Sequence, residues 1–209
     1  MTNFNTITSS IFMNSGTDPE TALPAAIAGR RNARRFTTVV AGELARISRG
    51  CNELSLVCAG VVDRGKLRER LGDAALARAE NTLASAMRQN MKECDCLGQI
   101  AEGRHALLLP GVGLSAARLH GEKLQESFAN RMRRHYRTGY LKITCALGIV
   151  CIGQGEQCSA GDLLERGSQA LQNALAQKIV HICQERAALS EHPTLVHSCE
   201  KRFLFFGEE

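Results

Sequence analysis

The sequence predicts an α+β fold of the ferredoxin-like, palm type, with a central, mainly antiparallel sheet of about five strands flanked by helices. Two observations favour this fold. Apolar residues alternate between helical spacing and short continuous runs, in the order helix, strand, helix pair, hairpin, helix, strand, helix, strand. The length of 209 residues also suits one domain of ordinary size with extensions, long enough to bury a core.

The first half of the chain predicts a helix, a buried strand and a long helical stretch. Apolar side chains in residues 21–50 recur on one helical face, and Gly50 is expected to end that helix. Residues 54–62 (LSLVCAGVV) are apolar on both faces, as in a central strand. Leucines and a methionine return to helical spacing across residues 66–90.

The second half predicts a hairpin followed by alternating helices and strands. Residues 92–111 have the pattern of strand, tight turn and strand, with the turn at residues 101–105. Later apolar patterns predict a helix from Leu114 to Phe128, a strand at residues 140–153, a helix from Leu164 to Ala174 and a strand at residues 178–183.

We divide the chain into an arm, one domain and an extension. Residues 1–20 are polar and are expected to be mobile, and residues 21–184 hold the pattern of helices and strands. Residues 185–209 are expected to form a final β-hairpin. Its phenylalanines either cover an exposed sheet edge or form a docking surface. They are Phe203, Phe205 and Phe206.

The composition argues against nucleic acid as a partner. The chain has no Trp, two Tyr and seven Phe, so it offers few rings on which bases could stack. The net charge of +5 is mild, and much of it lies in two arginine-rich segments, residues 29–35 and 131–137. We interpret these segments as solvated helix ends and loops, with an anionic partner as the alternative.

The nine cysteines are expected to be reduced thiols in a cytoplasm. The first residues lack the basic start and long apolar core of a signal peptide. No run of about 18 apolar residues exists to cross a bilayer, so we expect no membrane insertion.

Two groups of cysteine and histidine supply metal-binding atoms, but neither has the two-residue gap that is usual in zinc knuckles. We therefore expect no metal site and no other cofactor. The groups are Cys94 and Cys96 with His105, and His181 and Cys183 with His197 and Cys199.

Five segments, collinear between residues 32 and 183, carry motifs of one known family. NARRF (32–36) is similar to N-R-R-x-F, LSLVCAGVV (54–62) to L-S-L-L-L-L-D-I-D, and AEGRHALLLP (101–110) stands in place of G-G-D-E-F-x-x-L-L-P. TCALGIV (144–150) is similar to T-V-S-I-G-V-A, and QALQNAL (169–175) to x-A-L-Y-x-A-K. With these motifs in this order, the chain resembles the GGDEF domain of bacterial diguanylate cyclases, enzymes that condense two GTP molecules into cyclic di-GMP. The resemblance implies the palm-type GGDEF fold.

The resemblance also implies that the catalytic metal ligands are missing. Two-metal phosphoryl transfer needs carboxylates to hold the divalent ions. The family takes one from the end of the first strand, where this chain has Gly60. It takes the others from the third and fourth signature positions, where the chain has Gly103 and Arg104. The nearby carboxylates of Glu102 and Asp63 stand at other positions, Asp63 in an expected loop or helix cap. We therefore expect no diguanylate cyclase activity.

The positions that bind GTP in the family are replaced as well. The Asn and Asp that read guanine correspond to Arg68 and Ala77. The phosphate-facing lysines correspond to Gly65 and Leu175, and the arginine before the signature to Gln99. Because the replacements lie in separate segments, they strengthen the expectation that the chain does not turn over GTP.

One ligand site of the family is partly retained. KECD (92–95) stands where the family has its inhibitory R-x-x-D motif, whose Arg stacks on a guanine of cyclic di-GMP and whose Asp accepts from the base edge. Lys92 keeps the charge but loses the planar fork, so it suits a phosphate better than a guanine. The alternative is that Lys92 and Asp95 only end a helix and begin a strand at the surface.

We therefore expect a catalytically inactive GGDEF-like domain that acts as a regulatory or protein-interaction module in bacterial cyclic di-GMP signalling. A protein partner is expected, and homodimer formation is left open. The alternative is a receptor for cyclic di-GMP, with Lys92 and Asp95 in the binding site. Arg104 and His105 are either surface residues without a role or part of a new contact face for an acidic partner.

Overall fold

The computed structural model of the chain describes residues 25–47, 53–136, 142–153, 155–177 and 182–186. Helices and strands follow one another in the predicted order. They are α1 (Ala25–Ile47), β1 (Leu54–Val61), α2 (Arg64–Leu71), α3 (Asp73–Gln89), β2 (Cys96–Ala101), β3 (Arg104–Pro110), α4 (Leu114–His135), β4 (Cys145–Ile152), α5 (Ala160–Ala176) and β5 (Ile182–Arg186).

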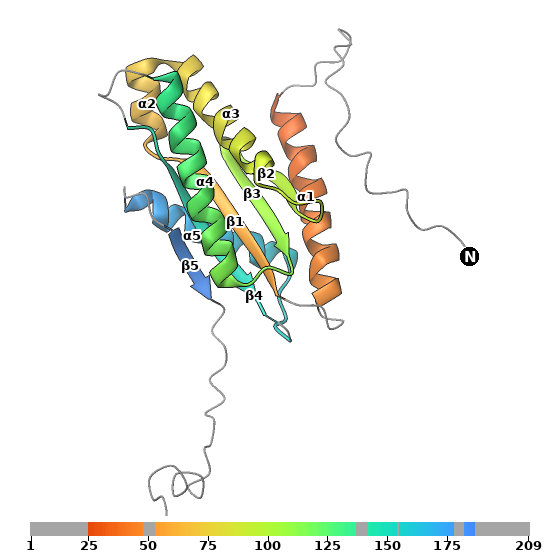
Figure 1. Ribbon diagram of the computed structural model, residues 1–209. Coiled ribbons are helices and arrows are strands. Elements are labelled where there is room, and N and C mark those ends of the chain that lie inside the picture. Colours follow the sequence, from red (N-terminus) through yellow and green to blue (C-terminus); the bar gives the residue numbers. More distant parts are fainter. Residues whose placement is uncertain (1–24, 48–52, 137–141, 154, 178–181, 187–209) are drawn as a thin grey trace, which may run out of the picture.

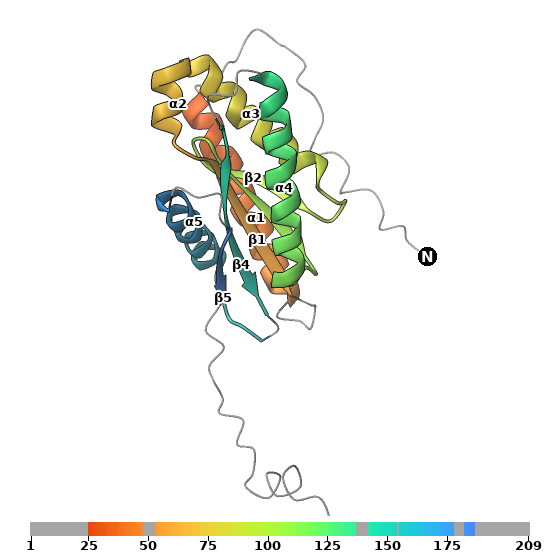
Figure 2. The ribbon, with the colours of Figure 1, turned by 60° about the vertical axis from the view of Figure 1, so that its left-hand side comes forward.

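One five-stranded sheet forms the middle layer, with strand order β2-β3-β1-β4-β5 (Figure 1). Neighbouring strands from β2 to β4 are antiparallel, and β5 pairs with β4 in parallel. The helices α3 and α4 pack on one face of the sheet, and α1 and α5 pack on the other, which a second view makes clear (Figure 2). The predicted α+β fold with a mainly antiparallel sheet is confirmed.

The central strand β1 is buried along its whole length, which explains why its sequence is apolar without alternation. Successive side chains of a strand point to opposite faces. Val57 and Ala59 therefore join the core under α3 and α4, while Leu56 and Cys58 join the core under α1 and α5. The sheet separates two apolar cores.

Some boundaries differ from those predicted. The helical stretch 66–90 consists of two helices that meet at Gly72, whose φ of 82° only glycine adopts readily. The predicted strand 140–153 corresponds to β4 at Cys145–Ile152, and just before it the carbonyl of Thr144 still accepts from the backbone N–H of Val62. The predicted last strand, 178–183, lies at Ile182–Arg186.

Other expectations lie outside the described residues. These are the N-terminal arm at residues 1–20 and the hairpin with Phe203, Phe205 and Phe206. Within the described ranges, no helix is both long and apolar enough to cross a membrane.

The backbone of α5 lies so close to β4 that there is no room for a side chain at Gly148. A Cβ built on Gly148 of β4 would lie 2.6 Å from the carbonyl carbon of Ala170 and 2.8 Å from Cα of Leu171. Both atoms belong to the backbone of α5, which cannot move aside as a flexible side chain can. Gly148 therefore sets the position of α5 on the sheet, and it is the glycine of the T-V-S-I-G-V-A-like motif.

We predict that Gly148→Ala lowers the free energy of unfolding by about 2 kcal/mol or more, because the added methyl group overpacks this contact. Gly42→Ala is the matched control. Gly42 lies exposed within α1, and a Cβ there would meet nothing within 4 Å. It should raise stability by about 0.5–1 kcal/mol through helix propensity. Urea denaturation measures both, and an unchanged midpoint for Gly148→Ala would contradict the packing described.

Candidate functional site

The candidate site lies where the end of β1 meets the start of β3. Gly60 and Arg104 are direct cross-strand partners in the β1–β3 pairing. A Cβ built on Gly60 would lie 3.9 Å from Cγ of Arg104, and 3.7 Å and 3.8 Å from the side chains of Leu171 and Leu175. Two positions from separate segments, both assigned to metal-binding carboxylates by the resemblance, are therefore adjacent. In place of carboxylates, Gly60 has no side chain and Arg104 has a guanidinium group.

The third of these positions, Gly103, forms the turn of the hairpin on the other side of the sheet. Its φ of +64° is a left-handed conformation that glycine adopts without strain. Gly103 is buried, and a Cβ there would lie 2.7 Å from Nη2 of Arg64 and would also collide with the carboxylate of Glu80. The space that a side chain would need is already filled.

An ion cluster of Arg64, Glu80 and Glu102 fills that space. The guanidinium of Arg64, at the start of α2, donates to Oε1 of Glu80 on α3 through Nε at 2.7 Å and Nη2 at 2.6 Å. Nη2 also lies 3.4 Å from Oε1 of Glu102 in the turn of the hairpin. The side chains of Arg64 and Glu80 are 30% and 19% exposed, so solvent screens this pair only in part. The cluster ties together α2, α3 and the hairpin.

Sequence reasoning missed this cluster. Arg64 and Glu80 lie on different helices, and Glu102 lies a further 22 residues along the chain from Glu80. No helical or strand periodicity relates the three, so only the fold brings them together. Two carboxylates lie near the positions that hold metal ligands in the family, and both have other partners. Glu102 pairs with Arg64, and Asp63 lies exposed just before α2, 3.7 Å from Nζ of Lys66.

Arg104 and His105 do not form one contact face. As successive residues of β3 they point to opposite faces of the sheet, Arg104 toward α5 and His105 toward the side of α3. His105 is half-buried, and burial together with the charge of Arg88 lowers the pKa of its imidazole. A partner that docks on one face of the sheet can contact only one of the two.

The Lys92–Asp95 segment is a tight turn between α3 and β2. The backbone N–H of Lys92 donates to Oδ2 of Asp95 at 2.7 Å, and the N–H of Asp95 donates to the carbonyl of Lys92 at 3.1 Å. The carboxylate of Asp95 is buried and holds the turn, while the side chain of Lys92 is exposed. Lys92 thus lies at the surface with its side chain in solvent, and Asp95 stabilises the turn through its carboxylate.

His120 of α4, which was not predicted, lies within electrostatic reach of this turn and of Lys123 on the same helix. The pKa of His120 is lowered mainly by burial, and it is also raised by Asp95 and lowered by Lys92 and Lys123. Nε2 of His120 is buried without a hydrogen-bond partner among the described residues. A helical pattern could place His120 and Lys123 on neighbouring turns, but only the tertiary structure shows that His120 lies near Asp95.

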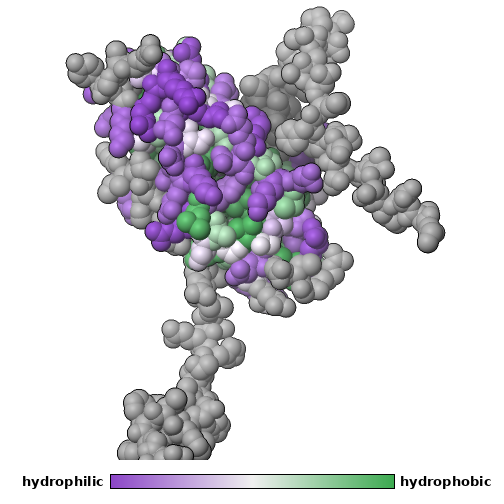
Figure 3. Space-filling model, in the orientation of Figure 1, coloured by the Kyte–Doolittle hydropathy of each residue, from purple (hydrophilic) through white to green (hydrophobic). Residues whose placement is uncertain are grey.

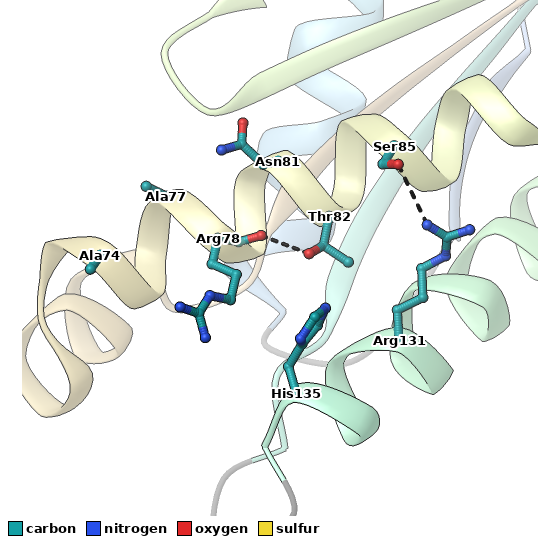
Figure 4. Close-up of a pocket in the computed structure, with 8 residues that line it drawn as sticks. All are labelled: Ala74, Ala77, Arg78, Asn81, Thr82, Ser85, Arg131 and His135. Atoms are coloured by element: carbon teal, nitrogen blue, oxygen red, sulfur yellow. Dashed lines mark hydrogen bonds between the residues drawn. The ribbon is translucent and has the colours of Figure 1, made fainter.

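The positions aligned with GTP-binding residues are occupied in other ways. Arg68 forms an exposed ion pair with Asp73 at 3.0 Å. Leu175 packs against the core of the α1 and α5 side, and a Cβ on Gly65 would meet nothing within 4 Å. Gln99 lies half-buried in β2. Ala77 lines a groove between α3 and α4 (Figure 4).

No group of side chains in the described ranges could hold a metal ion with three His, Cys, Asp or Glu ligands.

Comparisons with known proteins identify the family to which the chain belongs. The family model of the diguanylate cyclase GGDEF domain matches residues 27–179. Diguanylate cyclase DgcP of Pseudomonas aeruginosa is 27% identical over 158 residues, which are 76% of this chain and 22% of that protein. The chain thus spans about a fifth of the length of this curated relative.

Solved structures share the fold. The GGDEF domain of DgcB from Caulobacter crescentus, in complex with cyclic di-GMP, has a TM-score of 0.65 at 17% identity, over 83% of this chain and 98% of that one. Diguanylate cyclase SiaD of Pseudomonas aeruginosa, in complex with its activator SiaC, has a TM-score of 0.60 at 23% identity, over 82% of this chain and 62% of that one. The match of the family model to most of the chain, on the fold described, shows that the chain belongs to the GGDEF domain family.

Proposed function

We propose that this GGDEF domain is catalytically inactive and works as a regulatory or protein-interaction module in bacterial cyclic di-GMP signalling. The observation that carries the proposal is the pairing of Gly60 with Arg104 at the end of β1. Catalysis in this family needs divalent ions at this place, and carboxylate oxygens are the ligands that such hard cations prefer. Neither residue supplies one.

Electrostatics at the site do not favour a metal ion. A guanidinium at Arg104 repels a divalent cation on one side of the hairpin. On the other side, the carboxylates of Glu80 and Glu102 already have a cation, because Arg64 lies between them. A carboxylate introduced at Gly103 would meet Glu80, a like charge, in a space with no room. The cluster of Arg64, Glu80 and Glu102 is therefore complete without a metal ion.

A domain without turnover acts through what it binds. SiaD, which shares this fold, is known in complex with an activator protein, and this supports a protein partner here. The partner is a component of the same signalling system or a second copy of the chain. We place the protein in the cytoplasm, where its cysteines stay reduced; those whose side chains the structure describes are free thiols.

The chain is predicted to form no cyclic di-GMP from GTP with either Mg²⁺ or Mn²⁺. Liquid chromatography of the reaction mixture, with an active GGDEF domain as the positive control, measures the product. The double variant Gly60→Asp, Arg104→Glu should stay inactive, because the guanine-reading and phosphate-facing positions are replaced too. Clear product formation by the unmodified chain would refute the proposal.

The ion cluster makes a separate prediction about stability. Glu80→Gln removes the charge that Arg64 contacts at 2.6 Å, and we expect a loss of about 1–2 kcal/mol in the free energy of unfolding. Glu122→Gln is the control, since it breaks the exposed pair of Glu122 with Arg118, and it should cost less than about 0.5 kcal/mol. Equal losses in urea denaturation would mean that the cluster is an ordinary surface pair.

A second candidate function, a receptor for cyclic di-GMP, is favoured by the charges around Asp95. Lys92 and Lys123 each lie within electrostatic reach of His120 there. The two lysine ammonium groups suit the phosphates of the dinucleotide. The similar GGDEF domain of DgcB has been solved with cyclic di-GMP bound, which supports the same ligand for this chain.

Lys92→Ala tests this receptor function without disturbing the turn, because Asp95 holds the backbone N–H of Lys92 and not its side chain. If the site binds cyclic di-GMP, calorimetry should show saturable binding that weakens about tenfold or more in Lys92→Ala. Lys142→Ala, at another exposed lysine, should leave the affinity unchanged. A flat titration of the unmodified chain would exclude the receptor and leave the interaction module.

A further inference from the structure

The groove between α3 and α4 combines cationic side chains from both helices. It has a volume of about 490 Å³, within the range of small-molecule sites. Arg78 on α3 and both Arg131 and His135 on α4 extend into the space between the helices (Figure 4). No acidic side chain is among the described residues that line it, which are Ala74, Ala77, Arg78, Asn81, Thr82, Ser85, Arg131 and His135.

Helix geometry explains this arrangement. Arg78, Thr82 and Ser85 are spaced four and three residues apart, so they form one stripe of α3. Arg131 and His135 are four residues apart on α4 and face that stripe. Nη1 of Arg131 lies 3.5 Å from Oγ of Ser85, and this is a long contact between the two stripes. Two guanidinium groups and an imidazole are thus held around one space.

The dipole of α4 also explains why basic residues gather at its C-terminal end, but it does not explain all the basic residues of the groove. Basic residues in the last turn of a helix interact favourably with its dipole, and α4 ends in Arg133, Arg134 and His135. Arg78 lies within α3 and has no such role. Its guanidinium forms no ion pair or hydrogen bond with the part of the chain that is described. No carboxylate lies three or four residues from Arg78 or from Arg131 on its own helix.

We propose that this groove binds the phosphate group of a small organic phosphate. Guanidinium groups bind phosphate through paired, charge-assisted hydrogen bonds, and the hydroxyl of Ser85 adds a polar group beside Arg131. The surrounding surface is strongly hydrophilic where α2, the start of α3 and the end of α4 meet, so the ligand enters from water (Figure 3). The groove contains neither the ion cluster nor the turn at Lys92. It shares only Ala77 with the positions aligned to GTP-binding residues, and phosphate binding here does not depend on Ala77.

Calorimetry with inorganic pyrophosphate and with ATP, both without divalent metal at about 150 mM salt, tests the proposal. We expect saturable binding that weakens about tenfold or more in Arg78→Gln, Arg131→Gln. The matched control is Arg46→Gln, Arg118→Gln, which removes two arginine charges from the exposed ion pairs of Arg46 with Glu43 and Arg118 with Glu122. It should change the affinity less than about twofold. Tighter binding of ATP than of pyrophosphate would identify an organic phosphate, and equal binding would reduce the site to one for the phosphate group alone.

A site-specific measurement guards against misfolded variants. Pyrophosphate should shift the imidazole NMR signals of His135 in the unmodified chain and leave those of His105, on the sheet, unchanged. Each of three results would overturn the proposal. They are the absence of saturable binding, equal weakening in the two double variants, and shifts at His105 without shifts at His135.

Discussion

The antiparallel register of β1 and β3 is the constraint on which the rest of the site depends. It pairs Gly60 with Arg104 and places the turn of the hairpin against α2 and α3. The same register buries Leu56 and Leu108 on one face and Val57 and Leu107 on the other, so it cannot shift without exposing both cores. Packing therefore holds the hairpin in place whether or not a metal ion is bound there.

This separation explains how the framework of the family can persist while its chemistry changes. Gly148 is required by the close approach of α5, and the apolar run of β3 is required by both cores. Gly60 and Arg104 meet no such requirement, since the space around Gly60 is bounded by side chains at ordinary contact distance. At Gly103 the positive φ and the adjacent ion pair of Arg64 with Glu80 instead favour glycine.

Much of the fold could be predicted from the sequence, because apolar periodicity reports which faces are buried. The continuous apolar run of β1 and the helical spacing of α4 gave the right elements. A helix pair was predicted between β1 and the hairpin, but its break was not placed at Gly72, since an isolated glycine within a helical pattern is often tolerated. The start of β4 was predicted too early, because Lys142, Ile143 and Thr144 alternate polar and apolar as a strand does, although they lie outside β4.

Only the part of the candidate site that corresponds to family motifs in the sequence could be predicted. The adjacency of Gly60 and Arg104 was implied by family motifs, and the structure confirms it. The ion cluster and the α3–α4 groove join residues from separate elements, whose packing no local pattern encodes. For the same reason, the separation of Arg104 from His105 by the pleat of β3 was not recognised, although strand alternation could have revealed it.

The central claim is that the hairpin holds no divalent cation, and titration with Mn²⁺ tests it most directly. The paramagnetic ion broadens the backbone amide NMR signals of residues close to its binding site. The account predicts that the signals of Gly60, Gly103 and Arg104 keep their intensity at one equivalent of Mn²⁺, relative to signals in the centre of β1. Saturable broadening confined to those three residues would contradict it, because some carboxylates would then hold a metal ion at the hairpin after all.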